Sequence, residues 1–234
     1  MKIHIIIAGW DKERAVWGCT RIGADRVYLV VPEYLKHDID GWVNEKTRKA
    51  SRELKKKFSR YFPVKFVPVI YDDYVDCFKN IIKVIWKEKE KNNEVYVNIS
   101  SGSHVAASAA IFAASLTRCK AYYVIPERYD EVFKDESRFV SYGGKTIVPV
   151  PLLPISGMSE TEIEMLKLIG KHGRISAGEL AEKGKQLFSM PTRSKFNYYI
   201  NKLEGLGLVE NRIASGKLHT RVTDAGKMMI EAFN

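Results

Sequence analysis

The sequence predicts two domains: an α/β domain with a doubly wound, mostly parallel sheet that ends in a β-hairpin, and a smaller α+β domain after it. Three observations predict this. Short apolar runs alternate with helical patterns over the first half, a proline-rich segment follows, and the last third is mostly helical. Alternating strands and helices are typical of a parallel sheet that helices cover on both faces. We place the boundary between 154 and 155, which gives domains 1–154 and 155–234.

Five apolar runs rich in β-branched residues predict the strands of the first domain. Short continuous runs of this kind are typical of strands that are buried on both faces. The runs span 3–8, 27–31, 64–70, 95–99 and 121–125.

Three helical patterns lie between these runs, over 42–62, 73–90 and 103–117, and the last is rich in Ala and Ser. Steps of three or four residues place an apolar stripe along a helix. In the first helix the stripe consists of Val43, Thr47, Ala50, Leu54, Phe58 and Tyr61. In the second helix the inward positions are Val75, Phe78, Ile82 and Ile85. The many basic residues of the first helix face elsewhere. We interpret them as a solvated outer face, with nucleic-acid contact as the alternative.

The end of the first domain predicts the β-hairpin. Residues 138–142 and 145–150 have strand patterns, and Gly143-Gly144 between them is typical of a primed turn. Three prolines between 149 and 154 then interrupt the pattern. We expect a hinge directly after them, at Ile155-Ser-Gly-Met158.

The second domain begins with a capping-box pattern, Ser159-Glu-Thr-Glu162, which predicts a helix start. Ile175-Ser176 is expected to begin a second helix, and 192–206 to form a third. A hairpin over 208–222 and a last helix opened by Thr223 follow. Three helices and a basic hairpin of this size predict a winged helix-turn-helix.

Two phrases in this domain resemble winged-helix regulators of bacteria and archaea: LEGLGLVENR and TRVTDAGK. In helix-turn-helix docking, the N-terminal part of the second helix of the motif enters the major groove. Arg and Asn can contact base edges, whereas Lys mostly contacts phosphate. The candidate DNA-binding residues are Thr192, Arg193, Lys195, Asn197, Tyr198 and Lys202 on the helix, and Arg212, Lys217, His219 and Arg221 on the wing. The alternative is a winged helix used only for protein contact or dimerisation.

The charge of the chain favours an anionic partner. Lys and Arg number 38 against 28 Asp and Glu, the formal net charge is +10 and the pI is about 9.4. Nucleic acid or a phosphorylated ligand is the first expectation, and a basic protein with no such partner is the alternative. No apolar run approaches the length of a membrane span and no signal peptide is evident, so we expect a cytoplasmic protein without membrane contact.

Several sites are excluded by their missing motifs. The three cysteines are far apart in the sequence, so neither a disulfide framework nor a zinc ribbon is expected. No GxGxxG follows a strand, and Tyr142-Gly-Gly-Lys-Thr146 fails as a phosphate loop because position 139 is Phe139. Neither HExxH nor GxSxG occurs. We therefore expect no metal, no cofactor and no catalytic residue of these classes.

Two loops remain as candidates for ligand binding. One follows the first strand and one follows the fourth, and these strands are commonly adjacent where the strand order reverses. A Ser- and Gly-rich turn at a helix N-terminus offers backbone N–H groups to an anion. The candidate ligand-binding residues are Gly9, Trp10, Asp11 and Arg14 in the first loop and Ser100, Ser101, Gly102, Ser103 and His104 in the second. The alternative is that the serines only cap a helix and that Trp10 fills a crevice.

The segment Asn98-Ile-Ser-Ser-Gly-Ser-His104, the Ala-rich helix after it and the strand KAYYVIPE resemble the CARF domain, the CRISPR-associated Rossmann fold. With the winged helix, nearly the whole chain resembles archaeal CARF–winged-helix transcriptional regulators of CRISPR systems. The resemblance implies a Rossmann-like domain that binds a cyclic oligoadenylate across the twofold of a homodimer, through these two loops. Many relatives carry Gly-Gly-Thr and a basic residue where this chain has Ser101-Gly102-Ser103-His104.

The resulting hypothesis is a homodimeric regulator of transcription that binds double-stranded DNA and responds to cyclic tetra-adenylate or another small nucleotide. Two alternatives stay open. One is a metal-independent ring nuclease that cleaves the cyclic ligand with His104, Ser101 and Arg14. The other is a protein–protein adaptor with a vestigial pocket.

Overall fold

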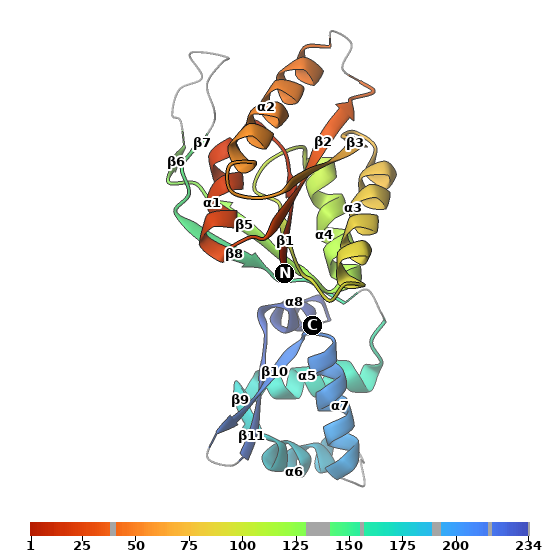
Figure 1. Cartoon of the computed structure of the whole chain (residues 1–234). Coiled ribbons are helices and arrows are strands. Elements are labelled where there is room, and N and C mark those ends of the chain that lie inside the picture. The colour runs from red at the N-terminus through yellow and green to blue at the C-terminus, as the bar shows by residue number, and fades with distance from the viewer. Residues whose placement is uncertain (38–40, 130–140, 155–156, 189–192, 215–216, 234) are drawn as a thin grey trace. The chain divides into compact units, whose positions relative to one another are not determined.

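The computed structural model of the chain describes residues 1–37, 41–129, 141–154, 157–188, 193–214 and 217–233 (Figure 1). The chain forms two compact units, Met1–Val150 and Pro151–Asn234, called unit 1 and unit 2 below. The domain boundary predicted from the sequence, between 154 and 155, lies in the segment that follows the end of unit 1.

Unit 1 is built on a six-stranded sheet in the order β3-β2-β1-β4-β5-β8. The first five strands of this sheet are parallel and β8 is antiparallel to β5. The predicted fold class, a Rossmann-like and mostly parallel α/β sheet, is confirmed. The strands are β1 (Lys2–Ile7), β2 (Arg26–Tyr34), β3 (Val64–Ile70), β4 (Glu94–Asn98), β5 (Lys120–Ile125) and β8 (Thr146–Val150).

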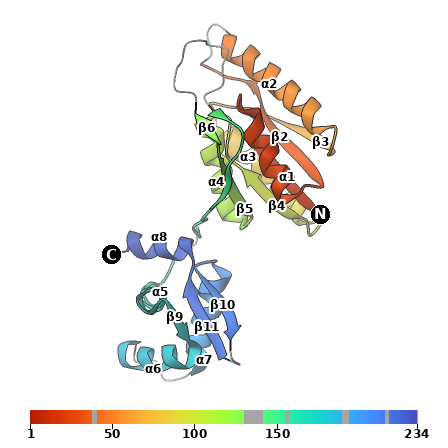
Figure 2. The same ribbon diagram turned by 90° about the vertical axis from the view of Figure 1, so that its left-hand side faces the viewer.

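Helices cover both faces of this sheet (Figure 2). They are α1 (Lys12–Ile22), α2 (Trp42–Phe58), α3 (Tyr74–Lys89) and α4 (His104–Thr117). Leu29 of β2 packs with the buried side chains of α1 and α2. The preceding residue, Tyr28, points to the opposite face because side chains alternate along a strand, and its hydroxyl donates a hydrogen bond to Glu88 of α3. Helix α4 lies beside α3, where the rings of Phe78 and Phe112 are 5.6 Å apart.

Two predicted helix faces need correction. Tyr61 is 69% exposed, because α2 ends at Phe58 and the chain turns before Tyr61 is reached. Val75 is 70% exposed, and the buried positions of α3 are instead Cys77, Ile81, Ile85 and Glu88. The first turn of α3 explains the difference, since its Asp76 accepts a hydrogen bond of 2.8 Å from the backbone N–H of Ile70 at the end of β3. This bond fixes the rotation of the helix so that Val75 faces outward.

A hairpin ends unit 1, but its arms pair differently from the prediction. Strand β8 pairs with β5, and the short β7 (Ser141–Tyr142) pairs with β6 (Arg128–Tyr129). The predicted pairing of 138–142 with 145–150 is therefore wrong, and residues 138–140 lie outside the described residues. Gly143, with φ +64°, turns the chain from β7 into β8, so both belong to one arm of a longer hairpin. Strand β8 pairs with β5 rather than with β7 because it forms backbone hydrogen bonds with β5 along its whole length.

Unit 2 combines helices with an antiparallel sheet in the order β10-β11-β9. Ser159 and Glu162 form the predicted capping box at its first helix. Ile175 and Ser176 lie in a short strand paired with β11, where Ile175 is buried opposite Thr220, and not in the predicted second helix. That helix begins directly after them, at Ala177, and the hydroxyl of Ser176 caps it by accepting a hydrogen bond of 3.2 Å from the backbone N–H of Glu179. The elements are α5 (Glu160–His172), β9 (Arg174–Ser176), α6 (Ala177–Phe188), α7 (Arg193–Gly205), β10 (Val209–Ala214), β11 (Lys217–Val222) and α8 (Asp224–Ala232).

The core of unit 2 joins α5, α6 and α7 to this sheet. Met165, Phe196 and Leu203 are fully buried in it. Gly184 of α6 allows the close packing, because a Cβ at this position would lie 2.1 Å from the ring of Phe196. Among the residues that the structure describes, no helix is both long and apolar enough to span a bilayer.

Candidate functional site

The loops after β1 and β4 meet at the carboxyl edge of the sheet of unit 1, the edge at which the parallel strands end. Strands β1 and β4 are neighbours, so the sheet order brings these two loops together. Gly9 in the first loop lies against Gly102 in the second: a Cβ on Gly9 would be 2.1 Å from the backbone nitrogen of Gly102. Gly102 has φ +88°, a conformation that favours glycine. Both glycines are therefore needed for the contact between the loops.

Asp11, at the end of the β1–α1 loop, and Arg14, in the first turn of α1 rather than in the loop as predicted, form a partly buried ion pair. Asp11 caps α1, and its carboxylate accepts a hydrogen bond of 2.6 Å from Nε of Arg14. The Arg14 guanidinium also donates to the hydroxyl of Tyr123 on β5, 2.6 Å away, and lies over the ring. Ser141 of β7 donates to the same Asp11 carboxylate. The side chain of Arg14 is 11% exposed and already has an anionic partner, so a ligand phosphate must share it with Asp11.

Trp10 is held against α2. Its indole N–H donates a hydrogen bond of 3.1 Å to Thr47, which is 5% exposed. The ammonium of Lys46 lies 4.2 Å from the centre of a ring of the Trp10 side chain. These contacts fix the orientation of the half-buried indole in unit 1.

The three serines after β4 direct their hydroxyls into the fold. Ser100 is 3% exposed, donates to the side chain of Asn98 and accepts a 2.8 Å bond from Val124 N–H. Ser101 donates to the carbonyl of Ile7 at the end of β1, at 2.8 Å. Ser103 caps α4 and donates to the carbonyl of Tyr71. All three serines were predicted to contact the ligand. Their hydroxyls instead bond to groups of the fold, as the alternative of a helix cap and its supporting turn predicts.

In the second loop, Gly102 and His104 are the exposed residues. His104 is the first residue of α4, where the leading backbone N–H groups of a helix lack partners within the helix. This end of a helix attracts anions. Below it, Nδ2 of Asn98 is buried and makes no hydrogen bond within the described residues.

Tyr71 is a structural residue of this edge that the sequence analysis missed. It is buried directly after β3, and its hydroxyl lies 2.5 Å from the carbonyl of Ala8 and 2.7 Å from that of Val30. Its own carbonyl accepts the bond from Ser103. Tyr71 thus connects the ends of β1, β2 and β3 with the start of α4. A signal was present in the sequence, because a tyrosine that directly follows one of the parallel strands lies at this edge.

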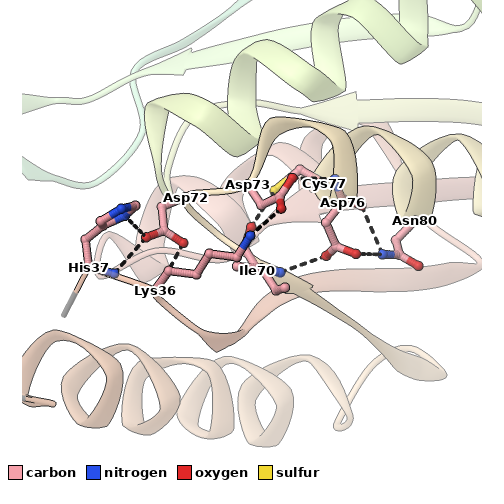
Figure 3. Close-up of polar contacts among 8 residues, drawn as sticks. All are labelled: Lys36, His37, Ile70, Asp72, Asp73, Asp76, Cys77 and Asn80. Atoms are coloured by element: carbon pink, nitrogen blue, oxygen red, sulfur yellow. Dashed lines mark hydrogen bonds and ion pairs between the residues drawn. The ribbon is translucent and has the colours of Figure 1, made fainter. Parts of the chain in front are cut away.

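The loops after β2 and β3 form a second, separate pair (Figure 3). Lys36 pairs with Asp73 at 2.6 Å, and the ring Nδ1 of His37 lies 2.6 Å from a carboxylate oxygen of Asp72. The backbone N–H groups of Lys36 and His37 also donate to Asp72, each at 3.0 Å. Burial raises the pKa of Asp72, but these hydrogen bonds outweigh it and the pKa lies below its usual value. The hydrogen bond from Lys36 likewise lowers the pKa of Asp73.

In the described part of the chain, no group of three or more His, Cys, Asp or Glu residues is placed to hold a metal ion. Of the residues considered for ring cleavage, Ser101 and Arg14 are bonded within the fold and His104 is exposed.

Residues 2–129 match the family model described as "HFX_2341_N:-like, N-terminal", more than half of the chain. The chain belongs to this family. An uncharacterized protein of Archaeoglobus fulgidus is 22% identical over 200 residues, which cover 81% of this chain and 83% of that protein.

Three solved structures also align with this HFX_2341_N:-like chain. Can2 from Sulfobacillus thermosulfidooxidans, in complex with cyclic tetra-adenylate, aligns with TM-score 0.44 and 11% identity over 100% of this chain and 64% of that chain. Csm6 from Enterococcus italicus, bound to cyclic hexa-2′-fluoro-hexa-dAMP, aligns with TM-score 0.42 and 17% identity over 58% and 36%. The protein VC1899 from Vibrio cholerae aligns with TM-score 0.41 and 14% identity over 98% and 64%. The chain spans at most 64% of the length of each of these structures.

Unit 2, outside the residues that match the HFX_2341_N:-like family, exposes part of the predicted DNA-binding set on α7. Lys195 and Asn197 are exposed, and Tyr198 is 59% exposed with its ring against Tyr199. Arg193 is the first residue of α7, and its side chain lies outside the described residues. Thr192 is also outside the described residues.

Several of the remaining candidates have partners in unit 2. Lys202 pairs with Glu162, a carboxylate that is 1% exposed at the start of α5. On the hairpin, Arg221 pairs with Glu210, and Arg212 lies 3.8 Å from the same carboxylate. His219 is half-buried opposite Arg212 in the ladder. Lys217 begins β11, and its side chain lies outside the described residues.

Proposed function

We propose that the chain is a ligand-responsive DNA-binding regulator that works as a homodimer. In this proposal unit 1 binds a small, phosphate-containing nucleotide at its carboxyl edge. Unit 2 is a winged helix that binds double-stranded DNA, with α7 in the major groove and the β10–β11 hairpin as its wing.

The observation that carries the ligand site is the contact of Gly9 with Gly102. The two loops approach so closely that the N-termini of α1 and α4 open at the same edge of the sheet. Helix N-termini and backbone N–H groups favour phosphate. Arg14 and His104 supply side chains of the matching kind. Together with the resemblance of Asn98–His104 to CARF domains, this favours a cyclic oligoadenylate as the ligand.

A thermal-shift series tests the ligand. The full chain is heated with cyclic tri-, tetra- or hexa-adenylate at about a hundredfold excess over the dissociation constant. A ligand that binds only the folded state then stabilises it by about 2.7 kcal/mol, which for a chain of this size raises Tm by roughly 5–10 °C. Chromatography of the same mixtures distinguishes binding from cleavage, because a linear product would support the ring nuclease instead. No shift with any of the three rings contradicts the proposal.

A matched pair of variants locates the site. His104→Ala removes an exposed side chain at the start of α4, and His172→Ala removes an exposed histidine at the end of α5 in unit 2. We expect both variants to keep the Tm of the ligand-free protein. Only His104→Ala should lower the shift caused by the ligand. Equal shifts in both variants would place the ligand elsewhere.

The DNA-binding role is supported by the order of elements in unit 2 and by the exposed face of α7. Arg193→Ala tests it at the N-terminus of that helix. If Arg193 contacts a guanine, the substitution should weaken binding by roughly 1–3 kcal/mol and relax the preference at one base pair. A selection of bound sequences from a random duplex library measures both. An unchanged sequence preference would remove Arg193 from base contact.

The homodimer predicts the form of the operator. A twofold-symmetric pair of winged helices contacts two half-sites about one helical turn apart. Footprinting should therefore show a palindromic or pseudo-palindromic site, and the mass of the complex should correspond to two chains per site. One chain on a single asymmetric site would contradict the dimer.

A further inference from the structure

We propose that unit 1 has a second nucleic-acid contact, which binds the phosphate backbone of duplex DNA without sequence preference. It lies on the outer side of α2 and at the start of β3. We call it the α2 basic surface, and it consists of Arg52, Lys55, Lys56, Lys57, Arg60 and Lys65.

The charge of unit 1 is concentrated in this part of the chain. Residues 45–65 contain nine Lys and Arg and two Glu, a net charge of +7. Residues 1–150 contain 26 Lys and Arg and 19 Asp and Glu, which is also +7. The rest of unit 1 therefore sums to zero. A cluster of this kind on one helix is the electrostatic footprint of a polyanion site.

The cations of the α2 basic surface are available to a partner. All six are exposed, and within the described residues none of them forms an ion pair with a carboxylate. Of the two acidic side chains in this segment, Glu53 is paired with Lys12 of α1.

The surface is continuous across helix and strand. The inward side of α2 is buried through Ala50, Leu54 and Phe58, which leaves the cations outward. The ammonium of Lys55 lies 4.7 Å from the centre of the Phe66 ring on β3, so the two elements share one face. Residues 52–58 of α2 cover about 9 Å at the rise of an α-helix. Duplex DNA presents about five charges over that length, at one per about 1.7 Å.

A duplex fits this surface better than a single strand. Single-strand sites use several aromatic side chains on which successive bases stack. On the α2 basic surface, the ammonium of Lys55 lies over the ring of Phe66, which leaves less of that ring for a base. The nearby ring of Tyr61 is 69% exposed, but one ring does not form a series on which successive bases can stack. Phosphate contact is therefore the main interaction available.

The surface is also separate from the ligand site. Helix α2 ends, and β3 begins, at the amino edge of the sheet, since a crossover helix returns the chain to the edge at which parallel strands start. The loops after β1 and β4 lie at the opposite, carboxyl edge. DNA binding by the α2 basic surface can therefore be tested without knowing whether the carboxyl edge binds a ligand.

The test uses the full chain and a 30-base-pair duplex of random sequence, with fluorescence anisotropy over a range of salt concentrations. The variant is Lys56→Gln/Lys57→Gln/Arg60→Gln. The plot of log K against log salt has a negative slope, and each phosphate contact that is lost should reduce the steepness of this slope by about 0.9. Three lost contacts should therefore reduce it by about 2.7. Affinity at a fixed low salt concentration should fall accordingly.

The matched control is Lys79→Gln/Lys83→Gln/Lys87→Gln on α3, which removes the same charge from exposed positions on the other face of the sheet. We expect the control to keep the slope of the wild type. Equal loss in both variants would mean that only total charge matters, and no loss in the α2 variant would remove the surface from DNA binding. Loss confined to a 30-nucleotide single strand would also overturn the proposal. Both variants should keep the wild-type Tm.

Discussion

At the residue scale, Ser100, Ser101 and Ser103 bond to groups of unit 1 itself, and Arg14 has Asp11 as its partner. A ligand at this edge therefore meets backbone N–H groups and His104 before it meets these side chains. The serines of the turn stabilise its shape.

His4 gives a prediction about pH. It is buried in β1, stacks on Tyr96 and hydrogen-bonds to Tyr122, and burial lowers its pKa from 6.5 to about 4. Between these two pH values the unfolded chain binds more protons, so the free energy of unfolding rises with pH in this window. The stabilisation is complete above pH 6.5 and is lost as the pH falls through 4. It amounts to about 3 kcal/mol, since each pKa unit corresponds to 1.36 kcal/mol.

Denaturant unfolding of the full chain between pH 4 and 7 measures this effect. His4→Gln should lower stability overall but flatten its dependence on pH in that window. His172→Gln, at an exposed position, should keep the wild-type profile. An identical slope in wild type and His4→Gln would assign the pH dependence to other groups.

The lysines of α7 are predicted to differ in role. Lys195 is exposed, whereas Lys202 pairs with the buried carboxylate of Glu162. Lys202→Gln leaves that carboxylate without its cation, so we expect a lower Tm. Lys195→Gln should keep the Tm and lower the salt slope of DNA binding by about 0.9, as expected for one lost phosphate contact. A Tm that Lys202→Gln leaves unchanged would contradict the structural role of the ion pair.

At the element scale, the two loops of the carboxyl edge are held by the approach of Gly9 to Gly102. Gly9→Ala must separate them, because the new Cβ would meet backbone atoms that cannot rotate away. We expect a loss of about 1–3 kcal/mol of stability, the usual cost of overpacking, and a smaller ligand-induced thermal shift. Gly178→Ala on α6 is the control, since a Cβ there meets nothing within 4 Å. Wild-type stability in Gly9→Ala would show that the loops do not need this contact.

The sequence predicted a strand or a helix correctly where a single apolar run or a single apolar stripe was enough to define it. The bounds of the five parallel strands and of α4 follow the apolar pattern closely, and α2 follows it as far as Phe58. The expectation that all five strands are buried on both faces is wrong for β3, which lies at the edge of the sheet and exposes Lys65 and Phe66. Three expectations were wrong where a partner distant in the sequence decided: β8 pairs with β5, Ile175 joins β11, and Val75 faces outward because Asp76 is tied to Ile70. Local sequence does not contain the position of these partners.

At the scale of the whole molecule, the proposed regulator requires coupling between ligand and DNA. A ligand can change DNA affinity only by binding the DNA-competent arrangement with a different affinity. The coupling is reciprocal, so the factor by which ligand changes DNA affinity equals the factor by which DNA changes ligand affinity. For a coupling free energy of 1–3 kcal/mol, this factor is roughly 5–150.

Titrations in both directions measure this factor on the same protein. DNA affinity is measured with and without saturating cyclic tetra-adenylate, and ligand affinity with and without saturating operator DNA. We expect equal factors that differ from one. A factor of one in both directions would mean that the two units bind independently and that the chain is no ligand-responsive regulator.

The sequence by itself determined the Rossmann-like sheet, the helices α2, α3 and α4 and the two candidate loops, because apolar periodicity and Ser- and Gly-rich turns are local properties of the chain. Helix α1 was not predicted. Only the tertiary structure decided what each side chain in the loops does. The sheet order placed β4 beside β1, and this adjacency made Gly9 a neighbour of Gly102, Ser103 a partner of Tyr71, and Arg14 a partner of Tyr123. Hydrogen bonds and steric contacts form between residues that are close in space. The order in which the strands pair determines which residues of the two loops are close.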